Sequence, residues 1–229
     1  MRSDISRSFP AVPRIDLRAS EAPRRAWVTD AAKRVCDIVL ASIGIVLLSP
    51  LMAIVAALVA IDGGHVLYSH PRIGRDGRVF GCLKFRTMIL GAMDCLDEYL
   101  AYHPQEREEW QSTRKLSFDP RTTAIGRLLR ETSLDELPQL FNVLRGDMSI
   151  VGPRPVTAAE LAMYGDKARL YTSVRPGITG PWQIGGRNDV SYAERVAIDA
   201  AYVTSRTLLG DFLIILRTPR AVFSRSGAR

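Results

Sequence analysis

Two adjacent acids are the residues of this chain best suited to chemistry on a phosphate. Asp135 and Glu136 lie in the segment TSLDELPQLFNVLRGDMSIVGPRP, residues 132–155. One carboxylate of such a pair can act as a nucleophile while its neighbour holds a metal ion. A structural explanation competes, because Ser133 and Glu136 fit an S-x-x-E capping box at a helix start. Pro138, a suitable first helical residue, favours a slightly later start, so local sequence leaves both interpretations open.

Basic residues that could bind phosphate lie elsewhere in the chain, several of them in restricted turns. The candidates are Lys84, Arg86, Arg154, Arg175 and Arg187. Arg154 lies between two prolines, so its guanidinium starts from a restrained position and loses little entropy when it binds a phosphate bidentately. Any one of these residues could be a solvated charge. Together with paired carboxylates they favour phosphoryl chemistry, because cations offset the repulsion between carboxylate and phosphate.

The elements that must position these residues include an apolar segment near the N-terminus. From Ile38 to Ile61 the chain has 24 consecutive uncharged residues, and about 20 suffice to span a bilayer. The segment starts too far from the N-terminus and runs too long for a cleaved signal peptide. Ser49-Pro50 near its middle predicts a bend, with the Ser49 hydroxyl able to satisfy a carbonyl that the proline frees.

Basic residues flank the apolar segment on both sides. They are Arg24, Arg25, Lys33 and Arg34 before it, and Arg72, Arg75, Arg78, Lys84 and Arg86 after it. Since basic residues near a membrane segment favour the cytoplasmic side, both ends of this segment are expected on the cytoplasmic side. We therefore expect a re-entrant helix-break-helix over residues 33–62, with a single-span anchor carrying a proline kink as the alternative.

The rest of the chain predicts one mainly helical α+β catalytic domain, residues 63–222, between a flexible basic tail, residues 1–32, and a short tail, residues 223–229. Residues 66–88 look extended, with a hairpin turn at Asp76-Gly77. Residues 92–115 look helical and solvated, with an interruption at Pro104. Two amphipathic stretches, near residues 125–130 and 208–216, fit either the headgroup layer or a core-facing helix.

Composition excludes several classes of protein. Lys and Arg total 31 against 24 Asp and Glu, which gives a formal charge of +7. This charge favours an anionic partner but does not say which kind. Three cysteines without a C-x-x-C pair or a histidine cluster argue against a disulfide scaffold or a zinc site, and favour a reducing compartment. The chain has no P-loop motif and no helix-turn-helix pattern, which disfavours a nucleotide hydrolase and a nucleic-acid binder.

Taken together, the motifs resemble the bacterial sugar transferase family, the monotopic polyprenyl-phosphate hexose-1-phosphate transferases. The similarity is greatest to short exopolysaccharide-initiating members, the undecaprenyl-phosphate galactose phosphotransferases. It covers residues 33–222 in order and rests on KRVCDIVLASIGIVLLSP, LKFRTM, SLDELPQLFNVLRGDMSIVGPRP, RPGITGPWQIGGRNDVSY and IDAAYV. Two departures are Pro181, where relatives often have an aliphatic or aromatic residue, and YVTSRT, which replaces Y-V-x-N-W-S.

The resemblance implies transfer of galactose or glucose 1-phosphate from a UDP-sugar to undecaprenyl phosphate, with release of UMP, as the first membrane step of exopolysaccharide synthesis. It implies that Asp135 forms a covalent phosphosugar and that Glu136 holds Mg²⁺. It also implies that Lys84, Arg154 and Arg187 bind phosphate and that Asp199 is a polar contributor.

The expected location is the bacterial inner membrane, with the catalytic domain on the cytoplasmic face in contact with membrane lipids. No nucleic acid is expected as a partner, and a homo-oligomer is left open. The alternative is a noncatalytic basic membrane scaffold for polysaccharide assembly, in which the acidic pair only caps a helix.

Overall fold

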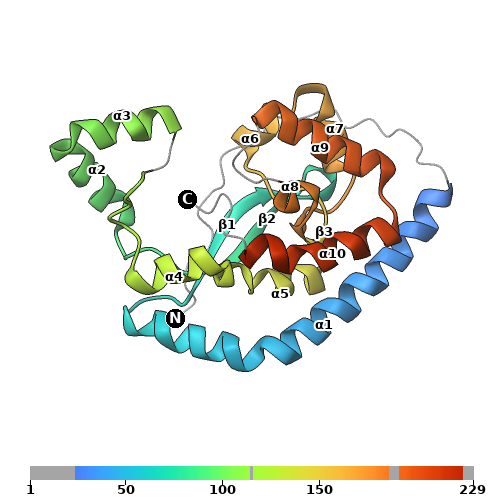
Figure 1. Ribbon diagram of the computed structural model, residues 1–229, viewed down its shortest axis with the longest axis horizontal. Helices are drawn as coiled ribbons and strands as arrows, with labels where there is room; N and C mark the ends of the chain where they lie inside the picture. The colour runs from blue at the N-terminus through green and yellow to red at the C-terminus, as the bar shows by residue number, and fades with distance from the viewer. Residues whose placement is uncertain (1–23, 114–115, 186–190, 224–229) are drawn as a thin grey trace.

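The computed structural model describes residues 24–113, 116–185 and 191–223, with side chains left out for residues 24–29, 112, 113, 222 and 223. It is a mainly helical α+β structure, as the sequence predicts (Figure 1). The helices after the first are α2 (Ala92–Tyr102), α3 (Pro104–Thr113), α4 (Ala124–Thr132), α5 (Gln139–Arg145), α6 (Ala158–Ala162), α7 (Ala168–Thr172), α8 (Pro181–Ile184), α9 (Tyr192–Ser205) and α10 (Leu208–Phe223). The short 3-10 turns are η1 (Arg75–Gly77), η2 (Leu134–Glu136) and η3 (Gly165–Lys167).

The first helix, α1 (Arg24–Ile61), is 38 residues long and contains the whole apolar segment. The helix continues through Pro50, and the Ser49 hydroxyl donates a 2.9 Å hydrogen bond to the carbonyl of Val46. That carbonyl lies four residues before Pro50, so it is the one whose usual partner the proline removes. The compensation predicted for Ser49 is confirmed. By length and composition, residues 30–61 of α1 could cross a membrane.

Both halves of α1 pack against the remainder of the molecule. Ala41, in the first half, is fully buried in a core cluster with Leu140 and Val143 of α5. Val59, in the second half, is 1% exposed and belongs to a cluster with Leu129 of α4. The opposite face of α1 remains uncovered and carries exposed residues such as Val46, Leu47 and Ile54. One side of α1 is therefore a protein interface and the other a continuous apolar surface.

Ion pairs tie the N-terminal end of α1 to the C-terminal helices. Arg206 donates to Asp30 at 2.7 Å, and Lys33 donates to Asp211 of α10 at 2.6 Å. Further along α1, the buried Asp37 carboxylate accepts from the Ser149 hydroxyl at 3.0 Å. These contacts connect residues more than 100 positions apart and fix α1 along the body of the molecule.

The hairpin predicted at Asp76-Gly77 is confirmed. Strands β1 (Leu67–Ile73) and β2 (Val79–Phe85) pair antiparallel, with Tyr68 opposite Lys84. Asp76 and Gly77 both have positive φ, 58° and 73°, the conformation that a tight hairpin connection requires. The hairpin holds Lys84 near the end of β2, where its side chain leaves the strand toward η2.

A second, parallel pair of short strands joins two of the motifs. Strands β3 (Ser149–Val151) and β4 (Gly177–Thr179) bring the Gly-Pro-Arg-Pro segment beside the Arg-Pro-Gly turn. Gly177 N donates to the Pro153 carbonyl at 2.8 Å. A Cβ built on Gly177 would lie 2.1 Å from Gly152 N, so only glycine allows this approach of the two backbones.

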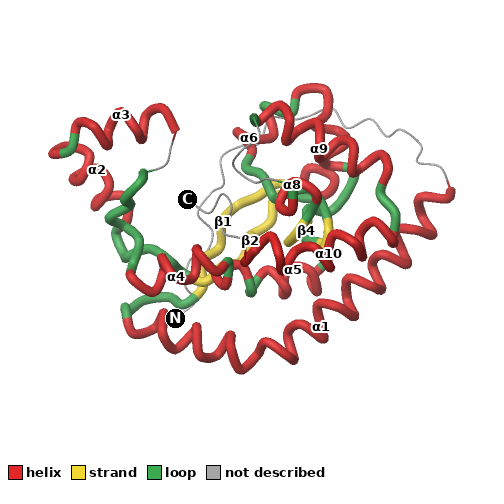
Figure 2. The backbone as a smooth tube through the Cα atoms, viewed as in Figure 1, coloured by secondary structure: helices red, strands yellow, loops and turns green. Residues whose placement is uncertain are grey.

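Two of the predicted helical stretches are surface features. The interruption predicted at Pro104 is confirmed, because α2 ends at Tyr102 and α3 begins at Pro104, and Figure 2 shows this helix pair standing apart from the main body. On α10, Leu209, Phe212 and Leu216 are each more than half exposed, so these apolar residues do not face the core.

Candidate active site

The acidic pair lies on the 3-10 turn η2, between α4 and α5. Ser133, which precedes the turn, has a φ of 57° and makes no side-chain cap. The Glu136 carboxylate instead accepts a 2.8 Å hydrogen bond from Lys84 Nζ. The capping box that the sequence allowed is therefore not formed, which removes the structural explanation for the pair.

Lys84 bridges both carboxylates. Its Nζ lies 3.1 Å from Asp135 Oδ2 as well as 2.8 Å from Glu136 Oε1. Asp135 is 6% exposed, and this burial raises the pKa of its carboxyl group above the ordinary value, against the opposing effect of Lys84. Burial lowers the pKa of Lys84, but Glu136 and Asp135 outweigh it and the net pKa is raised. Lys84 is thus held as a cation at the acidic pair.

Asn142 of α5 aligns the turn with the strand that carries Lys84. Its side chain is fully buried, accepts from Leu83 N at 2.9 Å and donates to the Gly81 carbonyl at 2.8 Å. Two bonds to the backbone of β2 fix the register between β2 and α5, and therefore between Lys84 and η2. Sequence reasoning missed this residue, whose only signal was one amide within an apolar helical run.

Arg130 is a second residue that the sequence reasoning did not assign to the site. From α4 it donates to the Thr87 hydroxyl at 2.9 Å and the Thr122 hydroxyl at 3.3 Å. Its positive charge lies close enough to Asp135 to lower the pKa of that carboxyl group, as the charge of Lys84 does, and so opposes the effect of burial. A basic residue five positions before Asp135 was the available signal.

The predicted phosphate-binding residues have different surroundings. Arg154 lies near Lys84, whose pKa its charge lowers, and its Cζ is 5.4 Å from the centre of the Trp182 ring. Arg86, just after β2, donates instead to the carbonyl of Val59 at 3.0 Å, at the C-terminal end of α1. Arg187 lies outside the described residues.

Two further predicted groups lie away from the acidic pair. Asp199 is 1% exposed on α9 and accepts from the Tyr164 hydroxyl at 2.7 Å. Burial raises the pKa of Asp199. Ser49 and Pro50, the predicted helix break, lie within α1.

The acidic pair offers two carboxylates, a type of ligand that Mg²⁺ accepts. No group of three or more His, Cys, Asp or Glu side chains with metal-binding geometry occurs in the described part of the chain. Mg²⁺ keeps several waters and commonly uses only one or two carboxylates together with substrate phosphates. Asp135 and Glu136 offer such carboxylates, and a cation, Lys84, already lies between them.

Comparison with known proteins identifies the family of the chain. Residues 28–225 match the family model described as bacterial sugar transferase. The chain is 51% identical over 198 residues to the exopolysaccharide production protein ExoY of Rhizobium meliloti, covering 86% of this chain and 88% of that protein. It is 49% identical over 196 residues to the undecaprenyl-phosphate galactose phosphotransferase of Salmonella typhimurium, again covering 86% of this chain but only 41% of that protein.

A more distant relative covers nearly the whole chain. The UDP-glucose:undecaprenyl-phosphate glucose-1-phosphate transferase of Caulobacter vibrioides is 35% identical over 228 residues, 96% of this chain and 79% of that protein. The family match includes α1 from residue 28 onward, the hairpin, the acidic pair and α10. The chain therefore belongs to the bacterial sugar transferase family.

Proposed function

We propose that this protein transfers a hexose 1-phosphate from a UDP-hexose to undecaprenyl phosphate and releases UMP, as the first membrane step of exopolysaccharide synthesis. The observation that carries the proposal is the buried Asp135 carboxylate, held beside Glu136 by the ammonium of Lys84. The names of the Salmonella and Caulobacter relatives support galactose or glucose as the hexose.

The proposed mechanism has two displacements at one phosphorus atom. A carboxylate oxygen of Asp135 bonds to the phosphorus next to the hexose, and the bond from that phosphorus to the bridging oxygen breaks, so UMP leaves with the electron pair. An oxygen of undecaprenyl phosphate then attacks the same phosphorus. The bond to Asp135 breaks, which restores the carboxylate and gives hexosyl diphosphate undecaprenol.

Lys84 serves both displacements by contact with the phosphoryl oxygens. An ammonium that lies between two carboxylates can turn toward an incoming phosphate without crossing the site, and its raised pKa keeps it charged. In a buried site such a charge stabilises developing negative charge more strongly than it would in water. Arg154, whose charge is felt at Lys84, is the second cation that we assign to the diphosphate.

We also propose that Glu136, with the diphosphate of the donor, holds Mg²⁺. When bound, this ion supplies neutralising charge to the phosphate oxygens. The adjacent carboxylates of η2 are the ligands that support the assignment.

For the membrane, we propose that α1 enters and leaves the cytoplasmic leaflet of the inner membrane, with residues 63–222 forming a catalytic domain on the cytoplasmic side. The support is that both ends of α1 are held by that domain. Lys33 is paired with Asp211 near one end, and the carbonyl of Val59 accepts from Arg86 near the other. A straight span would separate one end from its partners by about 30 Å of hydrocarbon. Basic residues at both ends support the same orientation.

A donor panel with purified protein tests the function. Undecaprenyl phosphate, Mg²⁺ and either UDP-galactose or UDP-glucose should give UMP and a radiolabelled lipid product, and Asp135→Asn should give neither. With donor alone, the wild-type protein should yield an acid-side-chain phosphosugar detectable by mass spectrometry. Full activity of Asp135→Asn would rule out the nucleophile, and absence of lipid product from every UDP-sugar would favour the scaffold.

A further inference from the structure

Arg154 is held in an unusual way for an arginine assigned to phosphate. The structure gives it no hydrogen bond and no ion pair to any described residue. Its one specific contact is with the ring of Trp182, 5.4 Å from its Cζ. Its donors are therefore not committed to any described residue, while its guanidinium carbon lies over an aromatic ring. What orients Trp182 consequently orients Arg154.

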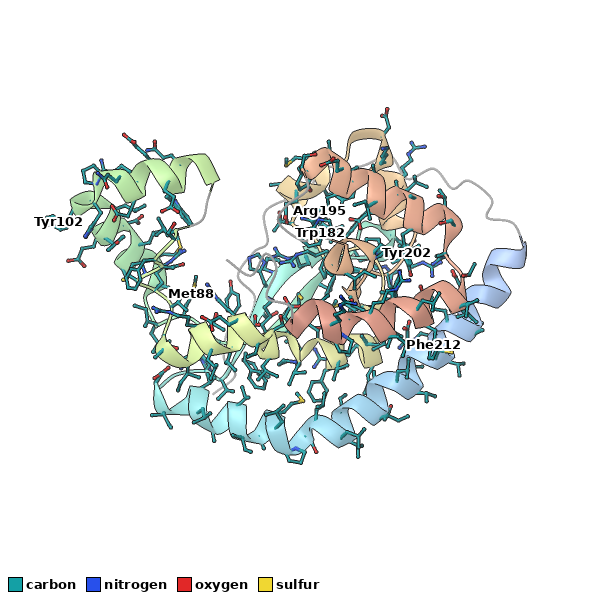
Figure 3. The ribbon with its side chains drawn as sticks, in the orientation of Figure 1. Met88, Tyr102, Trp182, Arg195, Tyr202 and Phe212 are labelled. Carbon is teal, nitrogen blue, oxygen red and sulfur yellow. The ribbon has the colours of Figure 1, made fainter. Side chains whose placement is uncertain are left out.

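Trp182 in turn lies against a second arginine. Arg195 Cζ is 4.6 Å from the centre of the Trp182 ring, and Figure 3 shows the two side chains next to each other. Pro181 opens α8 at its first position, so the residue that departs from the family pattern fixes the backbone immediately before Trp182.

Arg195 is itself fixed from its own helix. Its Cζ is 5.4 Å from the ring of Tyr192, which lies three residues earlier on α9 and therefore on the same face. The Tyr192 hydroxyl donates to the Glu160 carbonyl at 2.8 Å, which ties that ring to α6. The four side chains Tyr192, Arg195, Trp182 and Arg154 form one stack of alternating rings and guanidinium groups, which we call the cation-aromatic stack.

The bonding of Arg195 indicates that stacking is its main role. The side chain is 9% exposed, yet its Nε and Nη2 have no hydrogen-bond partner. Its Nη1 is 3.9 Å from the Glu160 carboxylate, and the charge of Arg195 acts on Asp199 one turn along α9. Those acids balance its charge without using its donors. A buried guanidinium with unused donors is costly, and here the compensating contacts are the two aromatic rings.

We propose that Arg195 and Trp182 are positioning residues for Arg154, and that the cation-aromatic stack holds the Arg154 guanidinium, donors free, for the diphosphate of the donor substrate. The inference rests on the proposed function and deepens it. It also gives Asp199 a role that sequence similarity did not supply, since its carboxylate lies close enough to Arg195 to balance the charge of the guanidinium. A planar guanidinium can stack on two rings at once, whereas an ammonium is a compact point charge, so lysine is a poorer substitute at position 195.

Steady-state kinetics on single variants test the stack. Trp182→Ala and Arg195→Gln should raise KM for the UDP-hexose by about two- to thirtyfold, the range of a buried cation–π contact. KM for undecaprenyl phosphate should not change. Trp182→Phe keeps a ring and should recover most of the affinity, whereas Arg195→Lys keeps the charge without the plane and should recover little. Recovery by lysine but not by phenylalanine would overturn the proposal.

A double-mutant cycle separates positioning from a general structural role. Once Arg154→Ala has removed the positioned group, Arg195→Gln should have almost no further effect on KM for the donor. Multiplied effects of the two changes would show that Arg195 acts independently of Arg154 and would overturn the inference. Trp110→Ala is the matched control, because it removes a cation–π contact with Arg121 that lies outside the stack, and it should leave KM unchanged.

Calorimetric titration with UDP gives a readout that does not depend on turnover. Weaker UDP binding by folded Arg195→Gln, with an unchanged melting profile or a lowered one, supports the stack. Wild-type affinity in that variant overturns it. Absence of lipid product from the wild-type protein would contradict the proposed function while leaving this binding test intact.

Discussion

Lys84 and Asp135, 51 positions apart in the chain, meet with their charged atoms 3.1 Å apart at the edge of the hairpin. The contact places a cation directly at the carboxylate assigned as nucleophile. It also explains how a buried acid is tolerated, since an unpaired charge at 6% exposure would be strongly destabilising.

Lys84→Met should reduce kcat by about 10²- to 10³-fold, the usual effect of removing one group that stabilises transition-state charge. Lys84→Arg should retain part of the activity because the charge remains. Steady-state assays measure both, with the exposed Arg78→Met on the same hairpin as control. Activity of Lys84→Met close to that of Arg78→Met would contradict the role of Lys84.

Asp135 should impose an acid limit on turnover. Burial raises the pKa of this carboxyl, so the nucleophile becomes protonated, and kcat falls, as the pH drops through a value above that of an ordinary aspartate. The pH dependence of phosphosugar formation measures the limit. A limit at or below the ordinary pKa of aspartate would argue against this assignment.

The raised pKa of Asp135 also determines how the stability of the protein should change with pH. The pKa of Asp135 is higher in the folded state than in the unfolded state. Its contribution to the free energy of unfolding is therefore fully present below the unfolded-state pKa and is lost as the pH rises through the folded-state pKa. Asp135→Asn, which resembles the protonated form, should therefore melt at or above the wild-type temperature at neutral pH while lacking activity. Thermal unfolding in detergent measures this, and a marked loss of stability would contradict it.

Asn142→Leu should destabilise the protein by about 2 to 4 kcal/mol, because it leaves the Leu83 N–H and the Gly81 carbonyl buried without this partner. Chemical or thermal unfolding measures the loss. The exposed Gln105→Leu on α3 is a matched control and should change stability little. Equal stability of the two variants would show that Asn142 does not join β2 to α5.

Lys33→Met should destabilise the protein by about 3 kcal/mol, since it leaves the buried Asp211 carboxylate without its cation. Replacing both partners, as Lys33→Met with Asp211→Leu, should recover part of the loss. Chemical unfolding measures the free energy of unfolding of the single and the double variant. If the double variant is less stable than Lys33→Met alone, the pair is not what holds α1 to α10.

Cysteine labelling tests re-entry. Single cysteines at Ala31 and Arg78 should both react with a membrane-impermeant maleimide in inverted vesicles and neither in intact cells. Cys36 and Cys95 are first replaced by serine. Cys82 can remain, because burial raises the pKa of its thiol to about 11 and keeps it unreactive. Labelling of the two positions from opposite sides would end the re-entrant proposal.

The sequence alone determined the features that depend on neighbouring residues. The hairpin at Asp76-Gly77, the interruption at Pro104 and the bond from Ser49 to the Val46 carbonyl each follow from turn chemistry or helix geometry over a few positions. Ordered motifs likewise sufficed to recognise the family. These signals are local, so they can be read without knowing how the chain packs.

Only the tertiary structure decided which partners the functional side chains take. Glu136 fitted a local capping box, yet it pairs with Lys84, 52 positions away. Arg86, two residues after Lys84, is directed to the end of α1 instead. Arg195 and Trp182 carried no recognisable signal. Such contacts form between segments distant in the chain, and the burial that makes each partner favourable exists only after those segments have packed together.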